Sequence, residues 1–139
     1  MKKFLATAMI VSSLFCLCSC KDYKNNIFFE NKTGEEIDGI YVSSEDSLQW
    51  GDKMNEDSVK SGSTLTIPKE KLVNGEGKYD VGAIDHKGNN YDIYEVNITI
   101  GDTLTLSEKD GVAILTVTTS SGDTKDYTGE EIYNKEKED

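Results

Sequence analysis

The stretch YDIYEVNITI, residues 91–100, predicts the fold of this chain. Apolar and polar side chains alternate along it, with Tyr94, Val96, Ile98 and Ile100 at one set of positions and Glu95, Asn97 and Thr99 at the other. A period of two is the side-chain spacing of a β-strand that buries one face. We therefore predict a strand over residues 91–100 that turns Tyr94 towards the core.

Short apolar runs separated by turn residues fill the rest of the chain. Such runs lie at residues 27–29, 37–42, 64–67, 79–83, 104–106 and 112–118, and residues 127–133 are expected to add an edge strand. Residues 69–73 are expected to form one helical turn. Between the runs lie Gly, Asn and Asp, which favour tight turns. This order predicts an all-β domain, a single antiparallel β-sandwich of about seven strands, with a small β-barrel as the alternative.

The N-terminus has the layout of an export signal. A short basic start precedes an apolar run over residues 4–17, which is shorter than the about 20 residues that a membrane-spanning helix needs. The residues that end this run, Leu17-Cys18-Ser19-Cys20, resemble the lipobox of bacterial lipoproteins. This resemblance implies cleavage after residue 19 and acylation of Cys20, for example by palmitate, so that the lipid anchors the chain in a membrane.

The lipobox divides the chain into four expected parts. These are a signal peptide (1–19), a lipidated tether (20–25), a β-sandwich domain (26–133) and a charged, disordered tail (134–139). A lysine directly after the anchoring cysteine resembles the outer-membrane sorting signal of enteric bacteria, and Lys21-Asp22 resembles the export signals of surface lipoproteins in the Bacteroides group. We expect an outer-membrane protein, with the cell surface and the periplasmic face both open.

Charge and residue usage exclude several functions. The formal net charge is −11 and the chain has no arginine, which argues against a nucleic-acid partner. The three cysteines lie at positions 16, 18 and 20, so the domain has no thiol for a disulfide, a metal site or catalysis. His86 lies in a turn-like stretch, without a nucleophile motif nearby, and we expect no enzyme activity.

Acidic residues gather in two segments. Asp46, Asp52, Glu56 and Asp57 lie in the polar segment 43–61, and Asp80, Asp85 and Asp92 flank the turn at residues 85–90. Calcium prefers several oxygen ligands from flexible loops, but the spacing of an EF-hand loop is missing. We expect no cofactor, with calcium as the alternative.

A set of short motifs over about residues 27–100 resembles a small β-sandwich module of secreted bacterial proteins that has no assigned activity. The motifs are Asn31-x-Thr33-Gly34, Ile40-Tyr41-Val42-Ser43, Trp50-Gly51, Tyr79-Asp80-Val81 and Asp85-x-x-Gly88-x-x-Tyr91. On one interpretation their aromatic residues belong to the core. On the other, Tyr41, Trp50 and Tyr91 form an exposed platform, because aromatic rings offer a large contact area to sugars or proteins.

Two tripeptides resemble the O-glycosylation signal of the Bacteroides group. They are Asp46-Ser47-Leu48 and Asp57-Ser58-Val59, and the resemblance implies that Ser47 and Ser58 accept glycans. A third match places Thr103 at the start of a predicted strand, where we expect no modification.

Together these features predict a lipid-anchored, non-enzymatic binding module of the envelope. Its expected ligand is a glycan, an envelope protein or a host protein. One alternative is an enzyme inhibitor or immunity-type lipoprotein that acts through a protruding loop at residues 43–61. The other is a structural or accessory envelope subunit, which buried aromatic residues would favour.

Overall fold

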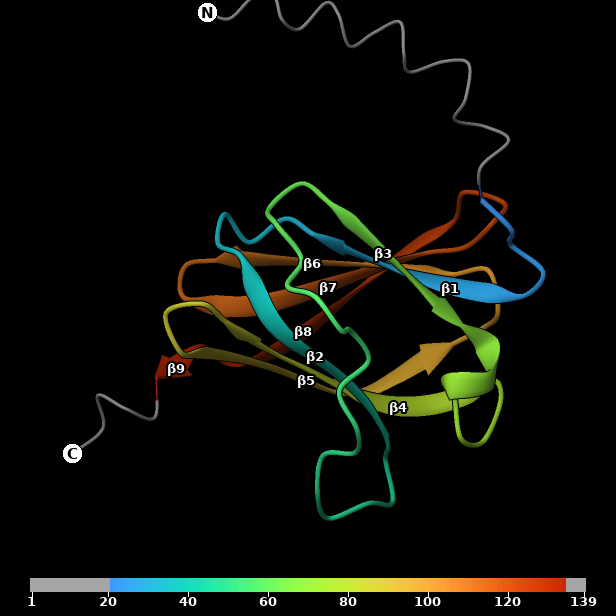
Figure 1. Ribbon diagram of the computed structural model, residues 1–139, viewed down its shortest axis with the longest axis horizontal. Helices are drawn as coiled ribbons and strands as arrows, with labels where there is room; N and C mark the ends of the chain where they lie inside the picture. The colour runs from blue at the N-terminus through green and yellow to red at the C-terminus, as the bar shows by residue number, and fades with distance from the viewer. Residues whose placement is uncertain (1–20, 135–139) are drawn as a thin grey trace, which may run out of the picture.

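Two β-sheets packed face to face form the domain, as predicted (Figure 1). The computed structural model describes residues 21–134. The first sheet has the order β3 (Thr64–Pro68), β1 (Asn26–Asn31), β6 (Thr103–Lys109), β7 (Val112–Thr118) and β8 (Thr124–Glu131). The second has the order β2 (Ile37–Ser44), β4 (Gly77–Asp85), β5 (Asn89–Ile98) and β9 (Tyr133–Asn134). All neighbours are antiparallel except β1 and β6. The predicted signal peptide, Cys20 and residues 135–139 lie outside the described residues.

The core lies between the sheets because apolar side chains alternate with polar ones along most strands. In β7, for example, Ala113, Leu115 and Val117 are buried while the residues between them are only partly covered. Pro68 ends β3, and the predicted helical turn follows as a 3₁₀ turn, η1 (Lys69–Lys71). The first four strands, β1 to β4, each contain the apolar run that predicts them.

The predicted tether packs onto the first sheet from residue 21 onward. The Asp22 carboxylate accepts hydrogen bonds from the backbone N–H groups of Lys24 and Asn25, at 3.0 and 3.2 Å. The Tyr23 ring meets the edge of Phe28 in β1, with 5.5 Å between the ring centroids. These contacts leave little free spacer between position 20 and the domain.

A β-bulge in β5 changes the phase of the strand. Between two successive inward pairs, β5 has one residue more than β4; the pairs are Tyr79–Val96 and Val81–Ile93. Glu95 has a φ of 56°, a left-handed conformation that non-glycine residues adopt at bulges and turns. The strand therefore bends at residues 94–95, and buried residues lie on both sides of the bend.

Tyr94 follows the inward residue Ile93 and faces outward, where it is 46% exposed, and the bulge then returns Val96 to the core. The prediction that Tyr94 faces the core is therefore wrong. A strict period of two assumes one residue per partner along the whole strand, and the extra residue breaks that assumption. The Asp80 carboxylate accepts a hydrogen bond from the Glu95 N–H at 3.0 Å, which holds the bulge against β4.

The sheets approach each other closely along β5 and β8. A Cβ atom on Gly129 in β8 would lie 2.5 Å from the carbonyl oxygen of Asp92 in β5. Just after β8, the chain crosses to the second sheet, where Tyr133 pairs with Asn90. The predicted edge strand over residues 127–133 is thus two strands in two sheets, β8 and β9.

At the edge of the second sheet opposite β9, residues 45–63 cover β2, and we call them the covering segment. Ile37 and Val59 exchange backbone hydrogen bonds at 2.9 and 2.8 Å. Asn55, which is 3% exposed, accepts from the Ile40 N–H at 2.9 Å and donates to the Asp38 carbonyl at 3.1 Å. An amide side chain has both a donor and an acceptor, so it takes the place of a strand residue here. Figure 1 shows that the part directly after β2 projects beyond the sandwich.

Candidate functional site

Three aromatic side chains form a row on the outer face of the second sheet. Trp50 comes from the covering segment and lies between Tyr41 of β2 and Tyr94 of β5. Its ring centroid is 6.3 Å from that of Tyr41 and 6.4 Å from that of Tyr94, with interplanar angles of 46° and 25°. Trp50 is 38% exposed and Tyr94 is 46% exposed. We call these three residues the aromatic row.

Gly82 in β4 has no side chain and so leaves room for the indole of Trp50 on the sheet. A Cβ atom on Gly82 would lie 2.8 Å from Cη2 and 2.9 Å from Cζ2 of Trp50, so the ring rests directly on the strand. The Ser43 hydroxyl oxygen accepts a hydrogen bond from the Gly51 N–H at 2.7 Å and ties the chain beside Trp50 to β2. The ring is therefore held on the sheet while part of it faces solvent.

Two clefts border Trp50. The smaller, of about 130 Å³, is lined by Trp50, Tyr94, Asp80 and residues 43 and 47–49. The larger, of about 230 Å³, has Gly82 among its lining residues; the others are Tyr41, Trp50, Gly51, Ala83, Ile84, Asn90, Asp92 and Tyr133. Both clefts thus combine ring surface with hydroxyl, amide or carboxylate groups.

The electrostatic environment of the aromatic row is acidic. Partial burial raises the pKa of Tyr94, and the negative charges of Asp92, Glu130 and Asp80 raise it further. The Tyr133 hydroxyl donates a hydrogen bond to Asp92 at 3.1 Å, which ties β9 to the same place. Among residues 21–134, each cleft is lined by a single charged side chain, and in both it is an aspartate.

Tyr91 does not belong to the aromatic row, so the predicted platform is wrong at this position. Its side chain is 2% exposed and faces the core. Its hydroxyl donates a hydrogen bond at 2.8 Å to Asp85, which is also buried. Burial and this hydrogen bond raise the pKa of Tyr91. Tyr91 therefore has a structural role.

Asp85 organises the turn that follows β4. Its carboxylate also accepts from the backbone N–H groups of Lys87 and Asn89, both at 2.9 Å. Burial acts to raise the pKa of Asp85, but the hydrogen bonds from Asn89, Tyr91 and Lys87 outweigh it and lower the pKa overall. His86 in the same turn is exposed and lies 3.4 Å from Asp38.

The two predicted glycan acceptors both lie at the surface. The Ser47 hydroxyl donates to the Gln49 carbonyl at 2.7 Å, within the projecting part of the covering segment. The Ser58 hydroxyl donates to the Glu36 carboxylate. Thr103 lies in β6, as expected. O-glycosylation at Ser47 and Ser58 stays a prediction.

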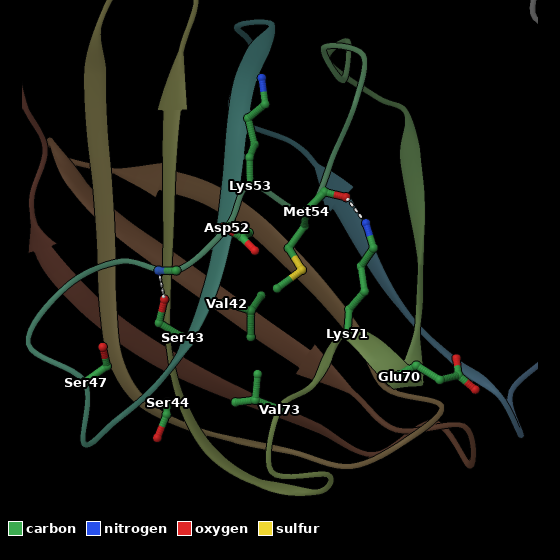
Figure 2. Close-up of a pocket in the computed structure, with 11 residues that line it drawn as sticks. Val42, Ser43, Ser44, Ser47, Asp52, Lys53, Met54, Glu70, Lys71 and Val73 are labelled. Carbon is green, nitrogen blue, oxygen red and sulfur yellow. Dashed lines mark hydrogen bonds between the residues drawn. The ribbon is translucent and has the colours of Figure 1, made fainter.

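A further cavity of about 560 Å³ lies beside the aromatic row, between β2 and η1. Figure 2 shows the apolar side chains of Val42, Met54 and Val73 at its centre. The Lys71 ammonium donates to the Met54 carbonyl at 3.1 Å. Figure 2 shows Lys53 and Glu70 pointing away from the centre, so the cavity offers mainly apolar contacts.

Residues 21–134 contain no group of three or more His, Cys, Asp or Glu side chains placed to hold a metal ion. In the same part of the chain, no helix is long and apolar enough to cross a membrane. The aromatic row is therefore the candidate site with the most developed geometry. Comparisons of the chain with protein-family models, with curated proteins and with solved structures find no match.

Proposed function

We propose that this protein is a lipid-anchored envelope protein whose domain binds carbohydrate, without catalysis, on the aromatic row. The observation that carries the proposal is the exposed row itself, in which Trp50 is fixed on Gly82 between Tyr41 and Tyr94. An exposed indole costs free energy in water, since its apolar surface stays hydrated. Its fixed position on the sheet favours a role in binding.

The geometry suits a chain of sugar rings. The C–H faces of a pyranose pack on aromatic rings, which lose little conformational entropy on binding. The three rings are spaced at 6.3 and 6.4 Å across β2, β4 and β5, so successive sugars would contact successive rings. Beside them lie the hydroxyls of Ser43 and Ser47 and the amides of Gln49 and Asn90, which match sugar hydroxyls.

The anchor at Cys20 belongs to the same proposal. Because residues 21–25 pack against the domain, acylation of Cys20 would hold the sandwich close to the outer membrane, on the surface or the periplasmic face. A Cys20→Ala variant tests this proposal by fractionation and by labelling with palmitate. The variant is expected in the soluble fraction and unlabelled; membrane association with retained label would refute the anchor.

The chain offers a direct probe, because Trp50 is its single tryptophan. We would titrate the full chain in detergent with a panel of oligosaccharides and follow the fluorescence of Trp50. A saturable change is expected. Because a favourable aromatic contact contributes about 0.5–1.5 kcal/mol, Tyr94→Ala should weaken binding by about 2–10-fold.

Tyr23→Ala is the matched control, because Tyr23 is 41% exposed but packs on the first sheet. It should leave the affinity unchanged. Trp50→Ala removes the fluorescent probe, so its affinity for the oligosaccharides is measured by isothermal titration calorimetry. This variant should no longer bind. No response to any oligosaccharide, or equal losses in Tyr23→Ala and Tyr94→Ala, would contradict the proposal.

One observation favours a second candidate, the inhibitor-like function of the covering segment. Leu48 is fully exposed in its projecting part, where it could dock on a protein. A Leu48→Ser variant separates the two candidates. Since Leu48 also lines the smaller cleft, the wild-type sugar response is the deciding readout: its presence supports the carbohydrate function, while its absence together with loss of binding to a purified protein partner in Leu48→Ser would favour the inhibitor.

A further inference from the structure

We infer that the carbohydrate bound on the aromatic row is the head group of a glycolipid, whose acyl chain lies in the cavity between β2 and η1. This inference rests on the proposed function and names its ligand class. Three features of the cavity support it: its apolar centre, the wall that it shares with the clefts of the row, and its place beside the N-terminal segment.

The centre of the cavity is apolar and has room for a hydrocarbon chain. Val42 and Met54 are buried in its wall, while Val73 beside them is 74% exposed. The volume of about 560 Å³ lies within the about 300–1,000 Å³ of small-molecule pockets. Figure 2 shows that the charged ends of Lys53 and Glu70 point away from this centre. A chain that covers Val73 removes its apolar surface from water, which favours binding.

The cavity borders the clefts of the aromatic row. Ser43 and Ser47 line both the cavity and the smaller cleft beside Trp50. Gly51, which directly follows Trp50 in the chain, lines both the cavity and the larger cleft. Figure 2 shows the two serines at one side of the apolar centre. A sugar stacked on Trp50 therefore has the serines at its side, and an acyl chain attached to it reaches the cavity along the protein surface.

The cavity also lies at the end of the sandwich where the N-terminal segment joins it. The Lys69 N–H, at the start of η1, donates a hydrogen bond to the Asn25 carbonyl at 2.9 Å. The next two residues of η1 line the cavity. Figure 1 shows residues 21–25 and η1 at this same end. A lipid on Cys20, directly before this segment, would hold the cavity close to the bilayer, which gives the acyl chain of a membrane glycolipid a short path into it.

The length of the chain sets the expected gain in affinity. A fully buried methylene tightens binding by about fourfold. Because Val73 leaves one side of the cavity open to solvent, we expect about half of that free energy, or about twofold per methylene. A hexyl group is five methylenes longer than a methyl group, so it should tighten binding by about 30-fold.

The test compares the methyl and hexyl glycosides of the oligosaccharide that binds most tightly in the panel. Both are titrated against the full chain in phosphatidylcholine vesicles, because the alkyl chain of a detergent would compete for the cavity. The fluorescence of Trp50 reports binding, and the free glycoside concentration is corrected for partition into empty vesicles. We call the ratio of the two affinities the chain preference.

Val73→Ser is the main variant, because Val73 lines the cavity but is not part of the core. It should lower the chain preference several-fold and leave the affinity for the methyl glycoside unchanged. Val73→Leu keeps an apolar wall and should keep the preference. Tyr23→Ala is the matched control, since Tyr23 is exposed at the same end of the sandwich but packs on the first sheet; it should keep the full preference.

The outcomes separate the inference from the proposed function. Equal binding of the two glycosides overturns the inference and leaves carbohydrate binding in place. A chain preference that survives Val73→Ser, or that falls equally in Tyr23→Ala, places the chain outside the cavity and also overturns it. Failure of every oligosaccharide in the panel overturns both.

A protein side chain is the other occupant that the test distinguishes. N-acetyl-leucinamide is titrated against the same vesicles by calorimetry, with the wild-type chain and with Val73→Ser. Binding that depends on Val73, together with equal binding of the two glycosides, would make the occupant an apolar side chain of a partner protein and refute the inference.

Discussion

Gly82→Ala should lift Trp50 from the sheet without removing any side chain of the site. The new methyl group would lie 2.8 Å from the indole, whereas ordinary contacts of a Cβ atom begin at 3.4 Å, so the ring must retreat by about 0.6 Å. Trp50 sits at the surface and can make this movement, while the strand backbone of β4 cannot. The structure therefore predicts a local change in ring position and exposure.

The effect on stability should be small. Alanine in a strand is favoured over glycine by about 0.5–1 kcal/mol, because glycine loses more conformational entropy on folding. The strain of moving an exposed ring acts in the opposite direction and lies at the low end of the about 1–3 kcal/mol typical of overpacking. The free energy of unfolding should therefore change by less than about 1 kcal/mol.

Fluorescence tests this prediction directly. The emission of Trp50 should shift to longer wavelength and acrylamide should quench it more strongly, while oligosaccharide binding weakens by about 2–10-fold. Gly51→Ala is the control, since the nearest atom to its new methyl group would be the Ser43 hydroxyl oxygen at an ordinary 3.5 Å. Unchanged emission in Gly82→Ala, or the same shift in Gly51→Ala, would refute the placement of Trp50 on Gly82.

Three further predictions concern stability. Gly129→Ala should cost about 3 kcal/mol in chemical unfolding, because its Cβ would lie 2.5 Å from a backbone oxygen of β5 that cannot move aside; a wild-type midpoint would contradict the close approach. Asn55→Ala should cost about 1–3 kcal/mol by the same measurement, since the buried Ile40 N–H loses its acceptor, and an unchanged free energy would mean that water replaces the amide. The lowered pKa of Asp85 predicts stability that is present above its unfolded pKa of about 3.9 and is lost as the pH falls through the lower folded value. Burial raises the pKa of Asp102, so this group has the opposite effect on the pH dependence of stability. Thermal midpoints of the wild-type protein from neutral to acidic pH should therefore be compared with those of Asp85→Asn. The profile of Asp85→Asn should be flatter at the acidic end.

Much of the fold follows from local sequence. Turn residues separate the apolar runs, and Pro68 and the Asn74–Gly77 stretch end and begin strands where the pattern places them. The pairing of the strands does not follow, because β1 contacts β3 and β6 across long stretches of chain. The crossing from β8 to β9 does not follow either, since the single edge strand predicted over residues 127–133 belongs to two sheets.

The site could be predicted only in part. Residue type alone marks Trp50, Tyr41 and Tyr91 as possible platform residues, whereas Tyr91 lies in the core and donates a hydrogen bond to the buried Asp85. Tyr94 was missed, although the sequence holds a signal. The apolar core residues of β5 occupy odd positions up to Ile93 and even positions from Val96, and such a change of parity requires a bulge between them.

That bulge also lets the side chains on the outer face change while the fold stays the same. One inserted residue gives the outer face two neighbouring side chains, Tyr94 and Glu95, between the inward residues Ile93 and Val96, while the strand on either side keeps its partners and its buried face. Changes at residues 94–95 can therefore alter what the domain presents to a ligand without repacking the interior. Relatives that share this sandwich but lack the extra residue would present a single outward side chain between these two inward residues, so they could keep the ring beside Trp50 or the acidic side chain, but not both.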